Sequence, residues 1–329
     1  MSDFSITKAA FSGWGLAARR PALTALLGAF GIVAGLVLAV ITVQIAGPQL
    51  MQMQASQEAM RAAQQAGNTD PAAMQAQGQA MQQNLGPILQ FYIVALLFAL
   101  VQSAVNAGAV NRAVLRPKTS RFPFIGLTGD EFRLMVVAIV LGVMFLIPSI
   151  VLSVITLIVG IGVAGGPAAL RGGGAGTMQL VLGGGGILIA VLAFLVGARF
   201  ALAMAQTVAE RGVRIFGSWE LTKGRYWKVV AALLLSLISL IPAACIAGLI
   251  LFGVARGTGV ELKSLMQPDY SDMAAIMTPL SIARYVVGGL MGALATIVTS
   301  SAAAYIYNAV SGGAVAGAVD DDDDEDWDD

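Results

Sequence analysis

Aromatic and cationic side chains are concentrated in one stretch of the chain, FGSWELTKGRYWKVV, at residues 216–230. Aromatic rings that carry a polar atom favour the boundary between membrane and water, because the ring can be half buried and half hydrated. Lysine and arginine at the same depth face anionic headgroups, and each contributes about 1 kcal/mol of attraction near the surface. The chemistry that this stretch predicts is therefore noncovalent binding of lipid headgroups. The candidate residues are Trp219, Lys223, Arg225, Tyr226, Trp227, Lys228 and, from a related earlier segment, Arg133.

The composition excludes several other kinds of functional site. The chain contains no histidine and a single cysteine, Cys245, which lies inside an apolar run. This excludes disulfides within the chain, zinc sites built from Cys and His, haem ligation by His, and acid–base catalysis by His. The remaining residues show no nucleophile–base pair and no cluster of metal ligands. We therefore predict no catalytic residue, no metal, no cofactor and no nucleic-acid partner, and we expect that the chain is not an enzyme.

The hydropathy of the chain is typical of membrane proteins. Of its 329 residues, 57% are hydrophobic and 12% are charged, whereas soluble domains carry about 25% charged residues. A membrane-spanning helix needs about 20 mainly apolar residues. Six stretches satisfy this requirement: 21–46, 87–110, 134–164, 184–206, 229–254 and 285–308. The predicted fold is an all-α, polytopic integral membrane helix bundle with six transmembrane helices, the first of them an uncleaved span.

The distribution of lysine and arginine predicts the orientation of the spans. Thirteen of these residues lie in the N-terminal region and in the loops after the second and fourth spans, and five lie in the opposite set of segments. Because positively charged loops stay on the cytoplasmic side, both termini are predicted to be cytoplasmic. Alanine, glycine and arginine are abundant, which is typical of a GC-rich bacterial genome. The expected location is therefore the bacterial inner membrane, with a multi-pass topology.

A block of acidic residues closes the sequence. Nine of the ten residues at 320–329 are Asp or Glu, whereas the rest of the chain carries 19 basic and 10 acidic side chains. A block of like charge repels itself, so we predict a disordered, acidic, cytoplasmic tail over 311–329, after a membrane domain at 1–310. Two roles stay open for the tail: it binds a basic partner, or it folds back over the basic loops of its own chain.

The aromatic stretch has a counterpart earlier in the chain. LTGDEFRLMVV at 127–137 aligns with LTKGRYWKVVA at 221–231 if one gap is allowed. Downstream of each, the tripeptide Leu-Ile-Pro recurs. Because membrane folds often arise from repeats, we predict three units, each a short amphipathic helix followed by two spans. The units are placed at about 1–110, 111–206 and 207–310, and the alternative is a chance similarity between low-complexity helices.

Two prolines and one arginine lie inside the predicted spans. Pro148 and Pro242 each remove a backbone donor, so both helices are expected to bend. Broken helices at matching positions of repeats can mark a transport site, although a membrane proline more often only shapes the bundle. Arg199 is either a functional intramembrane charge or a side chain that reaches the cytoplasmic interface.

Small residues and a polar insertion predict two further structural features. Gly31-x-x-x-Gly35 and Gly288-x-x-x-Gly292 predict the close approach of helices within one chain. The segment 47–86 is rich in Ala, Gln and Met and joins the first two spans on the extracytoplasmic side. Since these residues form helices well, we predict a polar helical hairpin.

The residues around Trp227 resemble a pattern found in bacterial membrane proteins. The pattern, Ser-x-x-Leu-Thr-x-Gly-x-aromatic-Trp, is formed by Ser218, Leu221, Thr222, Gly224, Tyr226 and Trp227. It is similar to that of the glycerophosphoryl diester phosphodiesterase membrane-domain proteins and of the uncharacterised YciC-like group. The resemblance implies a six-span membrane part of unknown task. It does not imply an esterase, because the catalytic part of such phosphodiesterases is a separate soluble barrel that uses histidine.

The combined expectation is a non-enzymatic inner-membrane protein that organises the membrane or interacts with lipid through its basic aromatic cytoplasmic loops. Its predicted partners are membrane lipids with anionic headgroups. The stretch at 216–230 is then either a lipid-recognition site or, in the more general role of aromatic belts, an anchor that fixes the depth of the fifth span. The alternative function is transport of a small solute or lipid, using the proline-bent spans and Arg199.

Overall fold

The computed structural model describes residues 4–65, 71–117, 129–163, 175–260 and 269–312, and the regular structure in these ranges is entirely helical. Within them, six segments are long and apolar enough to cross a membrane. They are Pro21–Ser56, Gly86–Leu115, Gly129–Val163, Gly183–Glu210, Tyr226–Gly257 and Pro279–Val310. The protein is therefore an all-α, multi-pass membrane protein, and the six predicted spans are confirmed. The acidic tail lies outside the described residues.

Short helices accompany the spans at one end of the molecule. Ser5 caps α1, because its hydroxyl accepts a hydrogen bond from the amide of Lys8 at 3.4 Å. α2 begins at Pro21, a residue suited to the first helical position because an N–H there would have no intrahelical partner. The helices are α1 (Ile6–Arg19), α2 (Pro21–Gln65), α3 (Pro71–Leu115), α4 (Gly129–Val163), α5 (Ala175–Phe200), α6 (Ala203–Glu210), α7 (Gly217–Thr222), α8 (Tyr226–Ile238), α9 (Ile241–Gly257), η2 (Ala275–Met277) and α11 (Pro279–Val310).

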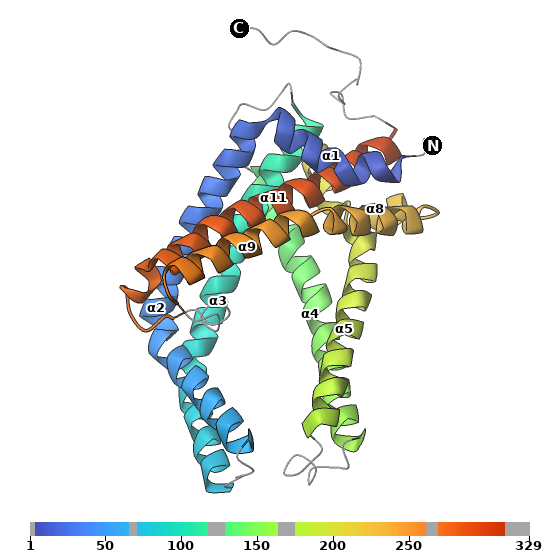
Figure 1. The fold of residues 1–329 in the computed structure, drawn as a ribbon. Coiled ribbons are helices and arrows are strands. Elements are labelled where there is room, and N and C mark those ends of the chain that lie inside the picture. Colours follow the sequence, from blue (N-terminus) through green and yellow to red (C-terminus); the bar gives the residue numbers. More distant parts are fainter. Residues whose placement is uncertain (1–3, 66–70, 118–128, 164–174, 261–268, 313–329) are drawn as a thin grey trace.

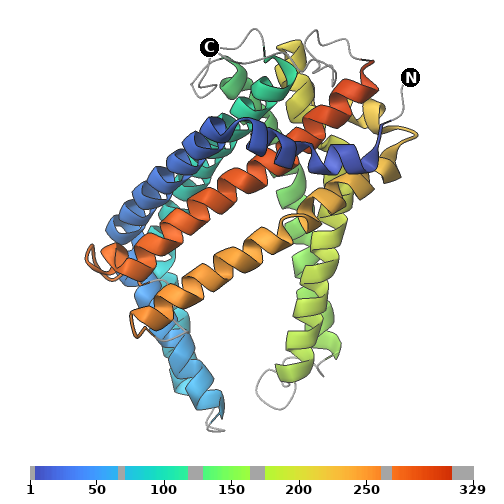
Figure 2. The same cartoon turned by 45° about the horizontal axis from the view of Figure 1, so that its top comes forward.

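Two long hairpins and a crossing helix make up the architecture (Figure 1). α2 pairs with α3, α4 pairs with α5, and the two hairpins diverge from the end of the molecule where α1 lies. α11 runs diagonally across the first hairpin in the view of Figure 1, and Figure 2 shows it alongside the first part of α2. α9 also contacts α11. α2 and α3 each contain 45 residues, so the described parts of the polar segment predicted at 47–86 prolong these two helices.

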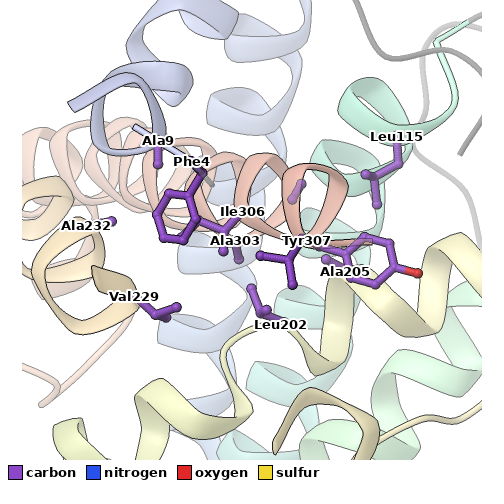
Figure 3. Packing of buried hydrophobic residues seen from close by; sticks show 12 residues of the cluster. Phe4, Ala9, Leu115, Leu202, Ala205, Val229, Ala232, Ala303, Ile306 and Tyr307 are labelled. Carbon is purple, nitrogen blue, oxygen red and sulfur yellow. The ribbon is translucent and has the colours of Figure 1, made fainter. Parts of the chain in front are cut away.

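The end at which the hairpins meet has its own hydrophobic core (Figure 3). The core contains Phe4, Ala9, Leu115, Leu202, Ala205, Val229, Ala232, Ala303, Ala304, Ile306, Tyr307 and Val310. These residues bring together the start of α1, the end of α3, α6, the start of α8 and the end of α11. We call this the basic end, because exposed cations lie on the helices and turns around the core: Lys8, Arg19, Arg211, Lys223 and Lys228.

Glycines allow α2 and α11 to approach each other closely. A Cβ atom added to Gly289 would lie 2.5 Å from the amide nitrogen of Ile32, and one added to Gly31 would lie 3.0 Å from the Cα atom of Gly289. Gly31 therefore makes the close contact that its motif predicted. The prediction for Gly288 and Gly292 was wrong, because a Cβ atom on either would meet open space. A shift of one residue along a helix turns a side chain by about 100°, which places Gly289 on the buried face and its neighbour elsewhere.

Replacing Gly289 by valine is expected to force α2 and α11 apart, because the new side chain would meet backbone atoms that cannot rotate away. The expected loss is about 1–3 kcal/mol in the free energy of unfolding, the usual range for overpacking. Gly292→Val is the matched control on the same helix, since it enters open space. Thermal unfolding of the purified protein, followed by tryptophan fluorescence, measures both variants, and equal losses would contradict the proposed contact.

The fifth span is divided into two helices near Pro242. α8 ends at Ile238, α9 begins at Ile241, and Pro242 lies in the first turn of α9. A proline has no N–H for the carbonyl four residues before it, here that of Ile238, and its ring clashes with that carbonyl. The helix is therefore interrupted where the sequence analysis expected only a bend.

Hydroxyl groups satisfy part of the backbone around this break. The hydroxyl of Ser236 donates to the carbonyl of Leu233 at 2.7 Å, and that of Ser239 donates to the carbonyl of Ser236 at 2.6 Å. The indole of Trp14, from α1, donates to the Ser239 hydroxyl at 2.9 Å. Pro148 has no Ser or Thr in the four residues before it and lies inside the uninterrupted α4. The two prolines, which were expected to act alike, thus have different local structures.

Candidate functional site

The aromatic stretch forms α7 and the start of α8, which are joined by a tight turn. α7 ends at Thr222, and α8 begins at Tyr226. Gly224 has a φ of 79°, in the left-handed region that glycine adopts without strain. The backbone N–H of Arg225 donates to the carbonyl of Thr222 at 3.2 Å across this turn. The turn thus explains the glycine of the pattern, whereas the aligned Gly129 is the first residue of α4 and has no positive φ.

Ser218 fixes α7 to the end of α5. Its side chain is fully buried, and its hydroxyl donates to the carbonyl of Arg199 at 2.8 Å while accepting from the amide of Leu202 at 3.2 Å. Thr222 is also buried and donates to the carbonyl of Trp219 at 3.0 Å. The hydroxyl residues of the pattern therefore position α7 from inside the protein and are not available to lipid.

Arg199, the predicted intramembrane charge, lies against two aromatic rings of the same stretch. Its guanidinium carbon is 4.0 Å from the ring centroid of Tyr226 and 5.0 Å from that of Trp219. A cation over an aromatic face is attracted by the ring quadrupole, which contributes about 0.5–2 kcal/mol. The hydroxyl of Tyr226 donates to the carbonyl of Leu195, one turn earlier in α5, at 2.8 Å. We call Arg199, Trp219 and Tyr226 the aromatic clamp, since they join the end of α5 to α7 and α8.

Other side chains of the stretch point outward. The rings of Phe216 and Trp227 are 68% and 71% exposed, and Lys223 and Lys228 are exposed beside them. Exposed rings among cations suit the headgroup region of a membrane, where lipid covers the ring and the ammonium or guanidinium groups stay hydrated. We call this face the aromatic–cationic surface. It consists of Phe216, Trp219, Lys223, Arg225, Trp227 and Lys228.

A second polar assembly, which the sequence analysis did not predict, connects α3 with α4. Arg112 forms a salt bridge with Glu131, and both residues are buried. Asp130 pairs with Arg116 at 3.3 Å and with Arg133 at 3.0 Å. Removing one partner of a buried ion pair leaves an uncompensated charge, so the pairs that Arg112 and Arg116 form hold the start of α4 against the end of α3, while Arg133 pairs within α4. We call these five residues the ionic cluster.

Arg116 extends the ionic cluster to α6. Its guanidinium donates to the carbonyls of Val208 and Ala209, the latter at 3.1 Å. Carbonyls at the end of a helix lack intrahelical donors, so a cation there is favourable. Burial lowers the pKa of Arg116, and the charge of Asp130 opposes this shift. Arg133, which was a lipid-binding candidate, thus lies in an ion-paired cluster on α4 and keeps a side chain that is 37% exposed.

Comparison with known proteins does not assign the chain to a family. No family model, curated protein or solved structure matches it. The resemblance to the glycerophosphoryl diester phosphodiesterase membrane-domain and YciC-like proteins therefore stays a prediction. The fold and the site define a class of molecule: a six-span, all-α membrane protein with an aromatic–cationic surface at one end.

The aromatic clamp is expected to contribute to stability through the coupling of Arg199 with Tyr226. A double-mutant cycle of Arg199→Ala and Tyr226→Leu is expected to show about 0.5–2 kcal/mol of coupling in the free energy of unfolding. Tyr226→Phe is the control, because it keeps the ring and removes only the hydrogen bond to Leu195. Unfolding in denaturant measures the free energy of unfolding of the wild-type protein, the two single variants and the double variant. Strict additivity of the two single variants would show that the clamp makes no contribution.

Proposed function

We propose that this chain is a non-enzymatic protein of the bacterial inner membrane that organises or senses the membrane by binding anionic lipid headgroups at its basic end. The observation that carries the proposal is the position of Trp227. Its ring is 71% exposed, next to Lys228, in the first turn of the helix with which the fifth span begins. Lipid of the interfacial region would cover the ring, while the cation beside it attracts phosphate.

The side of the membrane is inferred from charge. The N-terminal region and the loops after the second and fourth spans carry thirteen of the lysines and arginines, against five in the opposite segments. Positively charged segments stay in the cytoplasm, so we place the basic end and both termini there. The cytoplasmic leaflet is also the one that carries a negative surface potential, which matches the chemistry of the aromatic–cationic surface.

The aromatic–cationic surface is held in place by hydrogen bonds to α5, which supports the proposal. Ser218 and Tyr226 hold α7 and α8 through buried or partly buried hydrogen bonds to the end of α5. Trp227 and Lys223 therefore project from a backbone that is already ordered. A preorganised surface loses less conformational entropy when a ligand binds, so more of the interaction energy becomes affinity.

Replacing Trp227, Arg225 and Lys228 together by alanine is expected to reduce the anionic lipid that the purified protein retains. The variant removes two cations, each worth about 1 kcal/mol near the surface, and one interfacial ring, so the loss should be at least about tenfold in affinity. Lipid that remains bound after purification in mild detergent is quantified by mass spectrometry.

The matched control is a second exposed aromatic–cation pair, near the other end of the fifth span. There the guanidinium carbon of Arg256 lies 5.5 Å from the ring centroid of Phe252. The double variant Phe252→Ala, Arg256→Ala is expected to retain as much anionic lipid as the wild-type protein. Undiminished retention in the triple variant at the basic end would overturn the proposed function.

A second function, transport of a small solute or lipid, is favoured by the break between α8 and α9. The break lies inside the fifth span, and discontinuous helices expose backbone groups that form ligand sites in transporters. On this proposal, Pro242 and Pro148 shape the path and Arg199 supplies its charge.

Transport predicts that Arg199→Gln abolishes flux in proteoliposomes while the protein stays folded. Arg199→Lys, which keeps the positive charge, is expected to retain part of the flux. The measurement is uptake of radiolabelled solutes or of fluorescent lipid by vesicles that contain the purified protein. Transport is rejected if wild-type vesicles move none of the substrates faster than protein-free vesicles do.

A further inference from the structure

The last helix ends beside the aromatic–cationic surface. Tyr307 and Val310, in the last turns of α11, belong to the same hydrophobic core as Val229 of α8 (Figure 3). Val229 directly follows Lys228, a member of the surface. The chain that continues beyond Gly312 therefore leaves the protein at the basic end, next to the core on which the helix of Lys228 packs.

The segment that follows has the complementary charge and sufficient length. Seven uncharged residues come after Gly312, and then the block at 320–329 begins, with nine acidic side chains. Extended chain covers at most about 3.3–3.6 Å per residue, so the start of the block reaches up to about 26–29 Å from Gly312. Arg19, Arg211 and Lys223 are exposed cations of the same basic end.

We propose that residues 320–329 bind the aromatic–cationic surface of their own chain and compete there with anionic lipid headgroups. The inference rests on the proposed function, because it gives the lipid-binding surface an internal competitor. The ligand that the surface recognises is then a cluster of carboxylates. A tethered ligand reaches an effective concentration in the millimolar range, on the order of that needed to oppose weak headgroup contacts.

The competition makes occupancy of the surface depend on the charge of the membrane. In a weakly anionic leaflet the tail stays bound to the surface, and in a strongly anionic leaflet lipid headgroups displace the tail. Salt screens both attractions over about 8 Å at physiological ionic strength, so the contact of the tail is expected to weaken as salt rises.

Carbodiimide coupling tests the contact in the full-length protein, with one molecule in each phosphatidylcholine nanodisc. The reagent joins a carboxylate to an amine only where the two are in contact. At low salt, mass spectrometry is expected to find links from 320–329 to Lys223 or Lys228. Lys263, which lies in the sequence between α9 and α11, is the internal control and should stay uncoupled. Absence of links to Lys223 and Lys228, or links only to another molecule such as a basic partner, overturns the proposal.

A neutralised tail tests the competition. Replacing the eight aspartates of 320–329 by asparagine and Glu325 by glutamine keeps the length of the tail and Trp327. Retention of anionic lipid is expected to rise about three- to tenfold, because a tethered competitor is lost. If retention is unchanged while the Trp227, Arg225 and Lys228 triple variant loses lipid, the tail proposal fails and the proposed function stands. If neither variant changes retention, both fail.

Discussion

The packing of α11 is the constraint on which the rest of the molecule depends. α11 contacts both helices of the first hairpin, as well as α1, α6, α8 and α9. It has the lowest hydropathy of the six spans and is far more buried than α4, which has the highest. A span that faces lipid must be apolar, whereas a span enclosed by protein can use small residues and hydroxyls, because neighbouring helices fill the space around it. Gly289 and the run at 301–304, Ser-Ala-Ala-Ala, are such residues.

The same constraint determines where the candidate site lies. Gly13 of α1 packs so closely on α11 that a Cβ atom there would lie 2.4 Å from the Cα atom of Val298. α1 in turn contacts α8, and its Trp14 reaches Ser239 at the end of that helix. The position of α8, and with it that of Trp227, is therefore set by helices that are distant in sequence.

Features that depend on composition along a whole segment could be predicted from the sequence, and features that depend on one face of a helix could not. Each span is mainly apolar along its length, so the spans were evident. By contrast, Gly288 and Gly289 are neighbours on one helix and differ only in the face of the helix on which they lie. The sequence alone does not say which of them meets α2. The candidate site follows the same rule: its residue types indicated a membrane interface, but the inward position of Tyr226 and the outward position of Trp227 follow from the turn at Gly224.

The ionic cluster also shows what the sequence could have revealed. Asp130 and Glu131 lie together at the start of a helix, and Arg112 and Arg116 lie one turn apart at the end of another. This spacing is a signal for pairing across helices, although Arg112, Arg116 and Arg133 were interpreted from the sequence as loop charges that set the orientation. Arg116 also contacts carbonyls of α6, more than ninety residues later, a contact that only the tertiary structure reveals.

The second hairpin, formed by α4 and α5, is attached to the other helices at the basic end, and one of these attachments is part of the candidate site. Near the start of α4 the ionic cluster holds it to α3, and at the end of α5 the aromatic clamp holds it to α7 and α8. Trp219 belongs both to the clamp and to the aromatic–cationic surface, with its ring 47% exposed. A ligand that covers this ring changes the strength of the contact between Trp219 and Arg199, which positions the end of α5. By thermodynamic linkage, a change in the position of α5 alters the binding free energy of that ligand by the same amount. On the proposed function, lipid composition and the arrangement of the second hairpin are therefore coupled through one arginine and two aromatic rings.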